Sequence, residues 1–237
     1  MIMKRIQWVT VALLIAAGCA RAKNESIGRD VASAVEVATP LAPLDQKPSV
    51  GAGDTPSAAF QKSYNDEAAG AFELALSDLA GIATTGYVQY VVELRRAWLL
   101  YRLGRNAESV TAYGKASALD PTAVEPRLGS LPPLGALRRW TDVESTAREI
   151  LRKDSGNYTA TIRLAYALYS QAKYAEAEAT YRALLALYPS DVDVRAGLGW
   201  SLLKENKGPD AQTVFAEVLA IAPKNSLAIE GAAAARH

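Results

Sequence analysis

Residues 156–189 read GNYTATIRLAYALYSQAKYAEAEATYRALLALYP, and residues 190–223, SDVDVRAGLGWSLLKENKGPDAQTVFAEVLAIAP, follow the same pattern. The helix-ending turns of this part of the chain contain Pro121, Ser155, Pro189 and Pro223, which are evenly spaced. Apolar and small residues recur at helical spacing between the turns. Turns that recur at a constant interval, with helical segments between them, predict pairs of helices that stack on their neighbours, because one pair cannot bury its apolar faces alone.

The positions between the turns resemble the tetratricopeptide-repeat family. The resemblance rests on one series, Leu164, Ala165, Leu168, Tyr174, Ala177, Tyr181 and Pro189, and on its counterparts in the neighbouring repeats. It implies an all-α fold, a right-handed superhelix of antiparallel helix pairs. Small residues would let the paired helices approach, and Tyr113, Tyr181 and Phe215 would fill the space between repeats. The expected divisions are a partial repeat at 58–86, repeats at 87–121, 122–155, 156–189 and 190–223, and a cap at 224–237.

One repeat departs from this pattern. Leu131-Pro132-Pro133-Leu134 lies where the first helix of the repeat 122–155 should run. Proline inside a helix removes a hydrogen bond and clashes with the preceding turn, at a cost of about 3 kcal/mol or more. We therefore expect this helix to be kinked or split. A packed kink is favoured over backbone exposed for binding.

The first residues have the pattern of a secretion signal. Lys4 and Arg5 precede an apolar run at 6–17 that is too short to span a bilayer. The junction Ala16-Ala17-Gly18-Cys19 resembles the lipobox of bacterial lipoproteins, which implies a signal peptide at 1–18 and a lipid on Cys19. Cleavage after Ala22, releasing a soluble protein, is the alternative. Residues 19–57 are rich in Ala, Pro and Ser and are expected to form a flexible tether. In the lipoprotein family, Ala20 after the cysteine favours the outer membrane and a periplasm-facing domain.

The sequence offers little for catalysis. His237 is the single histidine and Cys19 the single cysteine, so metal sites and Cys/His catalysis are not expected. No nucleophile elbow or phosphate-binding loop occurs, and we expect neither enzymatic activity nor a cofactor. With 26 Lys and Arg against 25 Asp and Glu, the net charge of +1 gives no global attraction to nucleic acid.

Large aromatic side chains recur on the first helices of the repeats. Trp98, Pro132, Tyr166 and Trp200 hold the same position in successive repeats. In the tetratricopeptide-repeat family this face lines the concave surface, which implies a groove that binds a partner. The expected groove residues are Leu94, Trp98, Tyr101, Arg102, Ile162, Tyr166, Tyr169, Trp200, Leu203 and Lys204. Arg95 and Arg163 flank them and could meet an acidic segment. The alternative is that the aromatic stripe is core.

Two functions fit these features. The first is a lipid-anchored scaffold of the cell envelope that binds a protein partner in the groove and assists assembly of a secretion, pilus or polysaccharide-export machine. The second is direct binding of polysaccharide by the aromatic side chains, as part of an exopolysaccharide export complex. If the groove interpretation is correct, Trp98, Tyr166 and Trp200 should be partly exposed.

Overall fold

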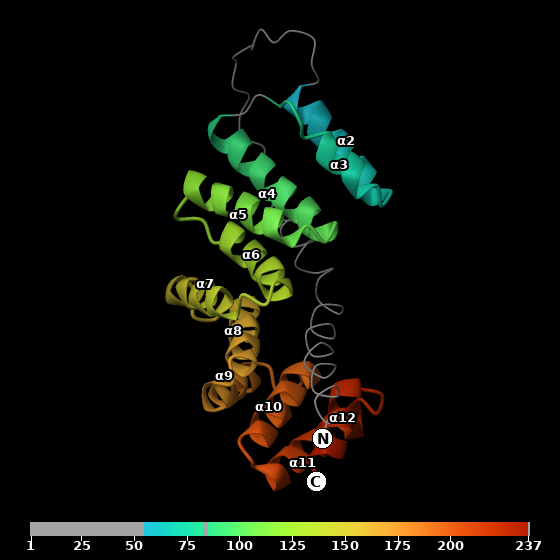
Figure 1. Cartoon of the computed structure of the whole chain (residues 1–237), viewed down its shortest axis with the longest axis vertical. Helices are drawn as coiled ribbons and strands as arrows, with labels where there is room; N and C mark the ends of the chain where they lie inside the picture. The colour runs from blue at the N-terminus through green and yellow to red at the C-terminus, as the bar shows by residue number, and fades with distance from the viewer. Residues whose placement is uncertain (1–54, 83–84, 237) are drawn as a thin grey trace, which may run out of the picture. The chain divides into compact units, whose positions relative to one another are not determined.

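A computed structural model describes residues 55–82 and 85–236. The expected signal peptide at 1–18, Cys19 and nearly all of the tether at 19–57 lie outside these residues. The described residues form eleven helices and no strand (Figure 1). The predicted all-α fold is confirmed.

The helices follow one another as pairs joined by short turns. The second helices of four pairs begin at Asn106, Trp140, Tyr174 and Gly208, which hold the same position in successive repeats. The bounds are α2 Pro56–Ala68, α3 Phe72–Ser77, α4 Gly86–Arg102, α5 Asn106–Leu119, α6 Glu125–Ala136, α7 Trp140–Lys153, α8 Tyr158–Ser170, α9 Tyr174–Leu187, α10 Val192–Lys204, α11 Gly208–Ile221 and α12 Ser226–Ala234.

The turn inside each pair uses a left-handed residue at one repeat position. Gly104, Arg138, Ala172 and Asn206 have φ of 73°, 56°, 60° and 63°. This conformation ends a helix and turns the chain toward the next one, and glycine adopts it without the steric cost that a Cβ brings. Only one of the four positions is a glycine, so the turns at Arg138 and Ala172 carry that cost.

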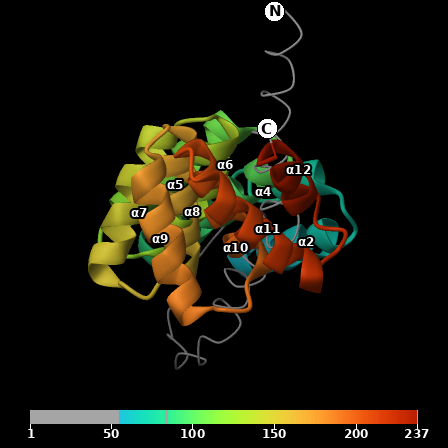
Figure 2. The ribbon, with the colours of Figure 1, turned by 90° about the horizontal axis from the view of Figure 1, so that it is seen from below.

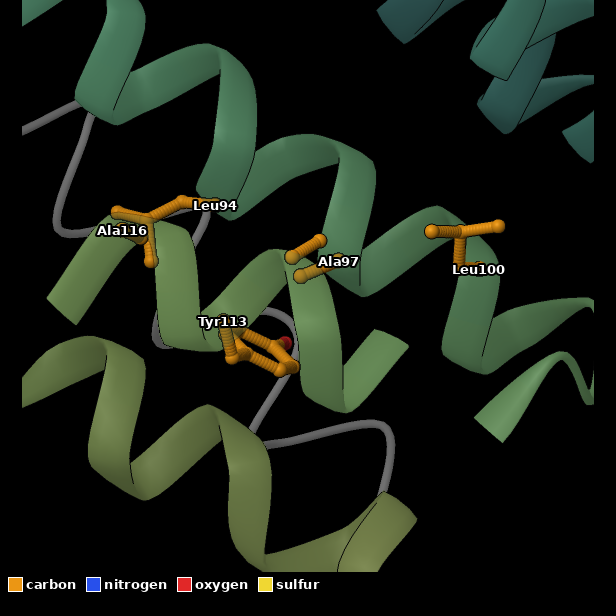
Figure 3. Close-up of a cluster of buried hydrophobic side chains, with 6 residues drawn as sticks. Leu94, Ala97, Leu100, Tyr113 and Ala116 are labelled. Atoms are coloured by element: carbon orange, nitrogen blue, oxygen red, sulfur yellow. The ribbon is translucent and has the colours of Figure 1, made fainter. Parts of the chain in front are cut away.

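The described chain divides into two compact units within α6, after Pro133. In the amino-proximal unit, 55–133, α4 packs against both α3 and α5. Figure 3 shows Leu94, Ala97 and Leu100 on α4 and Tyr113 and Ala116 on α5, with the Tyr113 ring directed toward α6, and these residues belong to one buried cluster. The first helix begins at Pro56, two residues before the predicted start of the folded part. Thr55 caps it, accepting from the Ala58 amide at 3.3 Å, and proline suits the first helical turn.

The helix that contains the two prolines is continuous. α6 runs from Glu125 to Ala136 with Pro132 and Pro133 inside it, so of the two expected outcomes, a kink or a split, the split does not occur. Proline cannot donate to the carbonyls of Leu128 and Gly129, four residues earlier. Leu131 and Leu134 are nearly inaccessible to solvent, and both prolines are buried as well. Burial of this apolar run offsets the lost hydrogen bonds.

In the carboxy-proximal unit, 134–236, successive helices pack as a continuous series. α8 packs against α7 and α9, α10 against α9 and α11, and α12 against α10 and α11. Figure 2 shows α12 beside these last two helices. The interior therefore runs from helix pair to helix pair within this unit.

Aromatic rings and glycines interlock at three of the contacts between successive pairs. A Cβ placed on Gly129, Gly197 or Gly231 would lie 2.3, 2.6 or 2.2 Å from the ring of Tyr113, Tyr181 or Phe215, respectively. In each case the glycine follows its aromatic residue at the same interval along the chain. The three rings therefore fill the space between repeats, as the sequence predicted. At the α7–α8 contact the equivalent residues are Ala147 and Arg163.

Candidate functional site

Trp98, the first aromatic residue of the predicted groove, packs against the preceding helices. Its ring is half-buried and lies on the cluster formed by Ala75, Leu79, Val92 and Leu99. The indole Nε1 donates to Oε1 of Glu67 on α2 at 2.7 Å. Trp98 thus has an apolar contact and a polar partner within the amino-proximal unit, and both tie α4 to α2 and α3.

Arg95 is an interior residue rather than a flanking cation of the groove. Its Nε donates to the Ser63 hydroxyl at 2.9 Å and its Nη1 to Glu67 at 2.8 Å. The guanidinium lies 3.7 Å from the centroid of the Tyr64 ring. The expectation that Arg95 meets an acidic partner was therefore wrong. Leu94 is also interior, in the α4–α5 cluster.

Tyr166 and Trp200, the other two aromatic residues of the stripe, are buried at 8% and 1% exposure. The Trp140 ring packs edge-on against Tyr166, with centroids 5.3 Å apart. The Trp200 indole donates to the carbonyl of Leu227 on α12 at 3.1 Å, and its ring meets Phe215 at 5.8 Å. The expectation that Tyr166 and Trp200 line an open groove was therefore wrong, because Trp140 and α12 cover them. Burying such large rings is favourable when the indole nitrogen keeps a partner.

The remaining predicted residues reach the surface in part. Arg102 is exposed and lies over the rings of Phe72 and Trp98, at 4.4 and 5.3 Å. Tyr101 beside it is half-buried and contacts Trp98. In the carboxy-proximal unit Ile162, Tyr169, Leu203 and Lys204 are half-buried. Burial lowers the pKa of the Lys204 ammonium. We call Tyr101 and Arg102 the residual surface of the amino-proximal unit, and Tyr169, Leu203 and Lys204 the residual surface of the carboxy-proximal unit.

A cavity that the sequence did not indicate opens in the amino-proximal unit, where α4 starts, α5 ends and α6 begins. Its volume is about 670 Å³, within the range of small-ligand sites. The residues that carry its chemistry are Tyr87, Tyr90, Leu119, Asp120, Val124 and Glu125. The Tyr90 hydroxyl donates to the Glu125 carboxylate. The sequence shows two tyrosines three residues apart in α4, but Asp120 follows α5 and Glu125 belongs to the next repeat, so only the packing of the helices brings them together.

Comparison with known families identifies the fold. Residues 135–192 and 168–235 each match a model of the tetratricopeptide repeat. Residues 135–235 therefore consist of tetratricopeptide repeats. Such repeats form a scaffold for protein–protein interaction, a fold that is not usual for an enzyme. A comparison with curated proteins gave no match.

Solved structures with the same fold include other tetratricopeptide-repeat proteins. MamA 41-end from Desulfovibrio magneticus RS-1 is 16% identical, with a TM-score of 0.68 over 74% of this chain and 99% of that one. A tetratricopeptide repeat protein from Parabacteroides merdae ATCC 43184 is 15% identical, with a TM-score of 0.72 over 77% of this chain and 73% of that one. At such identity the similarity shows the fold alone.

The tetratricopeptide repeats also carry a repeated ion cluster on their outer surface. Glu144 accepts from Lys173 at 2.8 Å and lies 3.0 Å from Arg148. One repeat later, Glu178 pairs with Lys207 at 2.6 Å and Arg182 at 2.7 Å. Hydrogen bonds from the lysines lower the pKa of each glutamate to about 2. The sequence itself indicates these clusters, because the glutamate, the arginine and the lysine recur at the same three positions of the next repeat.

Two further findings bear on function. Within residues 55–82 and 85–236, no helix is both long and apolar enough to cross a bilayer. In the same part of the chain, no three His, Cys, Asp or Glu side chains gather as metal ligands.

Proposed function

We propose that this tetratricopeptide-repeat protein is a non-enzymatic adaptor of the cell envelope that binds a protein partner on the residual surfaces of its two units. It would be held at the outer membrane, facing the periplasm, by a lipid on Cys19. There it would assist assembly of a secretion, pilus or polysaccharide-export machine.

The proposal rests on which aromatic and cationic side chains of the first helices remain accessible to solvent. Tyr166 and Trp200 are buried in contacts between helices, while Arg102 and part of Tyr101 remain accessible on α4. Leu203 and Lys204 end α10 in the same partly exposed state. Within each unit an apolar and a cationic side chain lie close together in sequence, and such a surface suits recognition of a protein segment with apolar and acidic residues.

The anchor has its support in the sequence. The short basic segment, the apolar run and the small residues before Cys19 resemble a lipoprotein signal. Residues 20–54 separate Cys19 from the first described residue. As a flexible chain, this segment would have a reach of roughly 30–36 Å.

Polysaccharide binding has lost its main support. Stacking of sugar rings needs aromatic faces that are open to solvent, and two of the three predicted rings are buried at 8% and 1% exposure. The third, Trp98, is half-buried against α3 and α4 residues. The protein-partner function is therefore the one we carry forward.

The two residual surfaces can be tested by removing the cation of each. We expect Arg102→Gln with Lys204→Gln to weaken capture of a crosslinked partner from intact envelopes by about tenfold while the thermal midpoint changes little. The matched control is Arg152→Gln with Lys224→Gln, which removes the same charge from exposed positions. Equal capture by both double variants would refute these surfaces.

The anchor can be tested separately. Wild-type protein should incorporate a labelled fatty acid and sediment with outer membranes, and Cys19→Ser should do neither. Absence of label from the wild-type chain would refute the anchor without bearing on the residual surfaces.

A further inference from the structure

The cavity at the start of α4 has aromatic and apolar walls. Tyr87 is 67% exposed at its edge, and Leu119 is 41% exposed. Tyr90 is half-buried and directs its hydroxyl to Glu125 at the start of α6. These side chains present apolar area to a ligand, which an aliphatic side-chain stem can cover.

Two carboxylates add negative charge to these walls. Asp120 and Glu125 line the cavity, and none of the described residues that line it is cationic. The Arg127 guanidinium, on the same segment, donates to the carbonyls of Ala123 at 2.6 Å and Pro121 at 3.0 Å. Burial, then the hydrogen bond to Glu125, and then the charges of Glu125 and Asp120 raise the pKa of the Tyr90 phenol above its usual range. The site therefore disfavours further negative charge.

The same unit shows what this combination of side chains does when a cation is present. Arg95 lies 3.7 Å from the Tyr64 ring centroid while its Nη1 donates to Glu67 at 2.8 Å. A ring face supplies cation–π attraction and a carboxylate supplies a charged hydrogen bond. Tyr87, Tyr90 and Glu125 offer both features in a cavity that is open to solvent.

We propose that this cavity binds the lysine or arginine side chain of a peptide. The ammonium or guanidinium would lie between Asp120 and Glu125, with its aliphatic stem against Tyr87 and Leu119. A volume of about 670 Å³ exceeds what one side chain needs, so the neighbouring peptide backbone also fits. The assignment rests on the proposed adaptor function, and it adds a basic residue to the features of the partner.

Amides of single amino acids test whether the cavity prefers a cationic side chain. The full chain, carrying 3-fluorotyrosine and held in detergent, would be titrated with N-acetyl-lysine amide, N-acetyl-arginine amide and N-acetyl-norleucine amide. Fluorine signals of Tyr87 and Tyr90 are assigned by replacing each with phenylalanine. We expect both signals to shift with the two cationic probes and to shift much less with norleucine, which matches the lysine stem without its charge.

Charge-neutral variants locate the binding. Glu125→Gln keeps an acceptor for Tyr90, and Asp120→Asn keeps an acceptor for the Thr122 and Ala123 amides, so the fold should be retained. Each should weaken binding of the lysine probe about fivefold, the effect of losing one partly exposed ion pair. Glu73→Gln, an exposed carboxylate on α3 outside the cavity, should leave binding unchanged.

The cation site would be overturned if norleucine shifted the signals as much as the cationic probes do, or if no probe shifted them. It would also be overturned if Glu73→Gln weakened binding of the lysine probe as much as Glu125→Gln or Asp120→Asn does. These probes need neither a protein partner nor a membrane. Their failure would therefore leave the adaptor function standing, whereas failure of partner capture with normal probe binding would remove the adaptor and leave the site.

Discussion

At the scale of single residues, glycine sets how closely successive helix pairs approach. Gly197 lies under the Tyr181 ring, where a Cβ would come within 2.6 Å of it. Real side-chain contacts do not become so short, so the ring or the helix would have to move. The glycine is needed for its small size, because its backbone is that of an ordinary helix.

Gly197→Ala should therefore destabilise the protein by about 1–3 kcal/mol through overpacking. Urea unfolding followed by circular dichroism measures this change. Gly114→Ala on α5 is the matched control, because a Cβ there meets nothing within 4 Å. The control substitution should raise the free energy of unfolding by roughly 0.5–1 kcal/mol, because alanine has the better helix propensity. Equal effects of the two substitutions would contradict the interlocking contact.

At the left-handed turn, a substitution at Ala172 should have the opposite effect and stabilise the protein. With φ at 60° the alanine Cβ is strained, and Ala172→Gly should raise the unfolding free energy by about 0.5–1 kcal/mol. Thermal unfolding of the two chains is sufficient to detect it. Ala179→Gly, at an exposed position inside α9, should lower stability by about 1 kcal/mol. Destabilisation by Ala172→Gly would show that the turn carries no strain.

The site illustrates what residue spacing can reveal. The repeat period predicts that Trp98, Tyr166 and Trp200 hold the same position on the first helices of their repeats. Whether such a ring is exposed depends on residues from other helices. Trp140 covers Tyr166 and α12 covers Trp200, and neither contact follows from the pattern within a single repeat.

At the scale of helices, the repeated ion clusters join α7 and α9, two of the second helices, to the turn of the next pair. Glu144 on α7 binds Lys173 before α9, and Glu178 on α9 binds Lys207 before α11. The glutamate side chains are only 14% and 13% exposed, so these pairs are less screened than most surface pairs. The clusters reinforce the spacing between pairs from outside the apolar core.

These clusters predict a pH dependence of stability. Each glutamate has a pKa lowered from 4.5 to about 2 in the folded protein, so the unfolded chain binds protons more readily. The stabilisation is complete above about pH 4.5 and is lost as the pH falls toward 2. Glu144→Gln with Glu178→Gln should reduce this loss by about 1 kcal/mol per site.

Urea unfolding of the double variant and the wild type between pH 6 and 2.5 measures the difference. Asp210→Asn, on α11 outside both clusters, is the control and should keep the wild-type dependence. Parallel curves for the wild type and the double variant would show that the pairs contribute nothing.

Helix boundaries were more predictable than helix continuity. The turns at Pro121, Ser155, Pro189 and Pro223 each follow the second helix of a pair, because each helix pair needs a break in hydrogen bonding at its end. The same rule applied to Pro132 and Pro133 predicted a kink or a split, and the split does not occur. Local backbone cost was outweighed there by burial, which a single repeat does not reveal.

At the scale of the whole molecule, stability depends on covering the ends of the helix series. In the carboxy-proximal unit α12 covers Phe215 and accepts the Trp200 indole hydrogen bond. In the amino-proximal unit α2 supplies Glu67 to Arg95 and Trp98. Repeat arrays need such terminal elements because an uncovered last pair exposes apolar surface.

Deletion of residues 225–237 should therefore expose Trp200, shift its fluorescence to longer wavelength and lower the thermal midpoint. Loss of the cover over two large aromatic rings should cost roughly 3–5 kcal/mol. Ile229→Ala removes an apolar group that is 49% exposed on the same helix and should change stability by less than about 0.5 kcal/mol. Unchanged Trp200 emission after the deletion would contradict the role of α12.

The interlocking ring and glycine also bear on how repeat number can change during evolution. The ring lies in the second helix of one repeat and the glycine in the first helix of the next, always at the same interval. Loss of residues 190–223 would bring Gly231 to the same distance after Tyr181 that Gly197 has now. Removal or duplication of this whole period thus preserves a ring–glycine contact at the new junction, whereas a change of any other length destroys it.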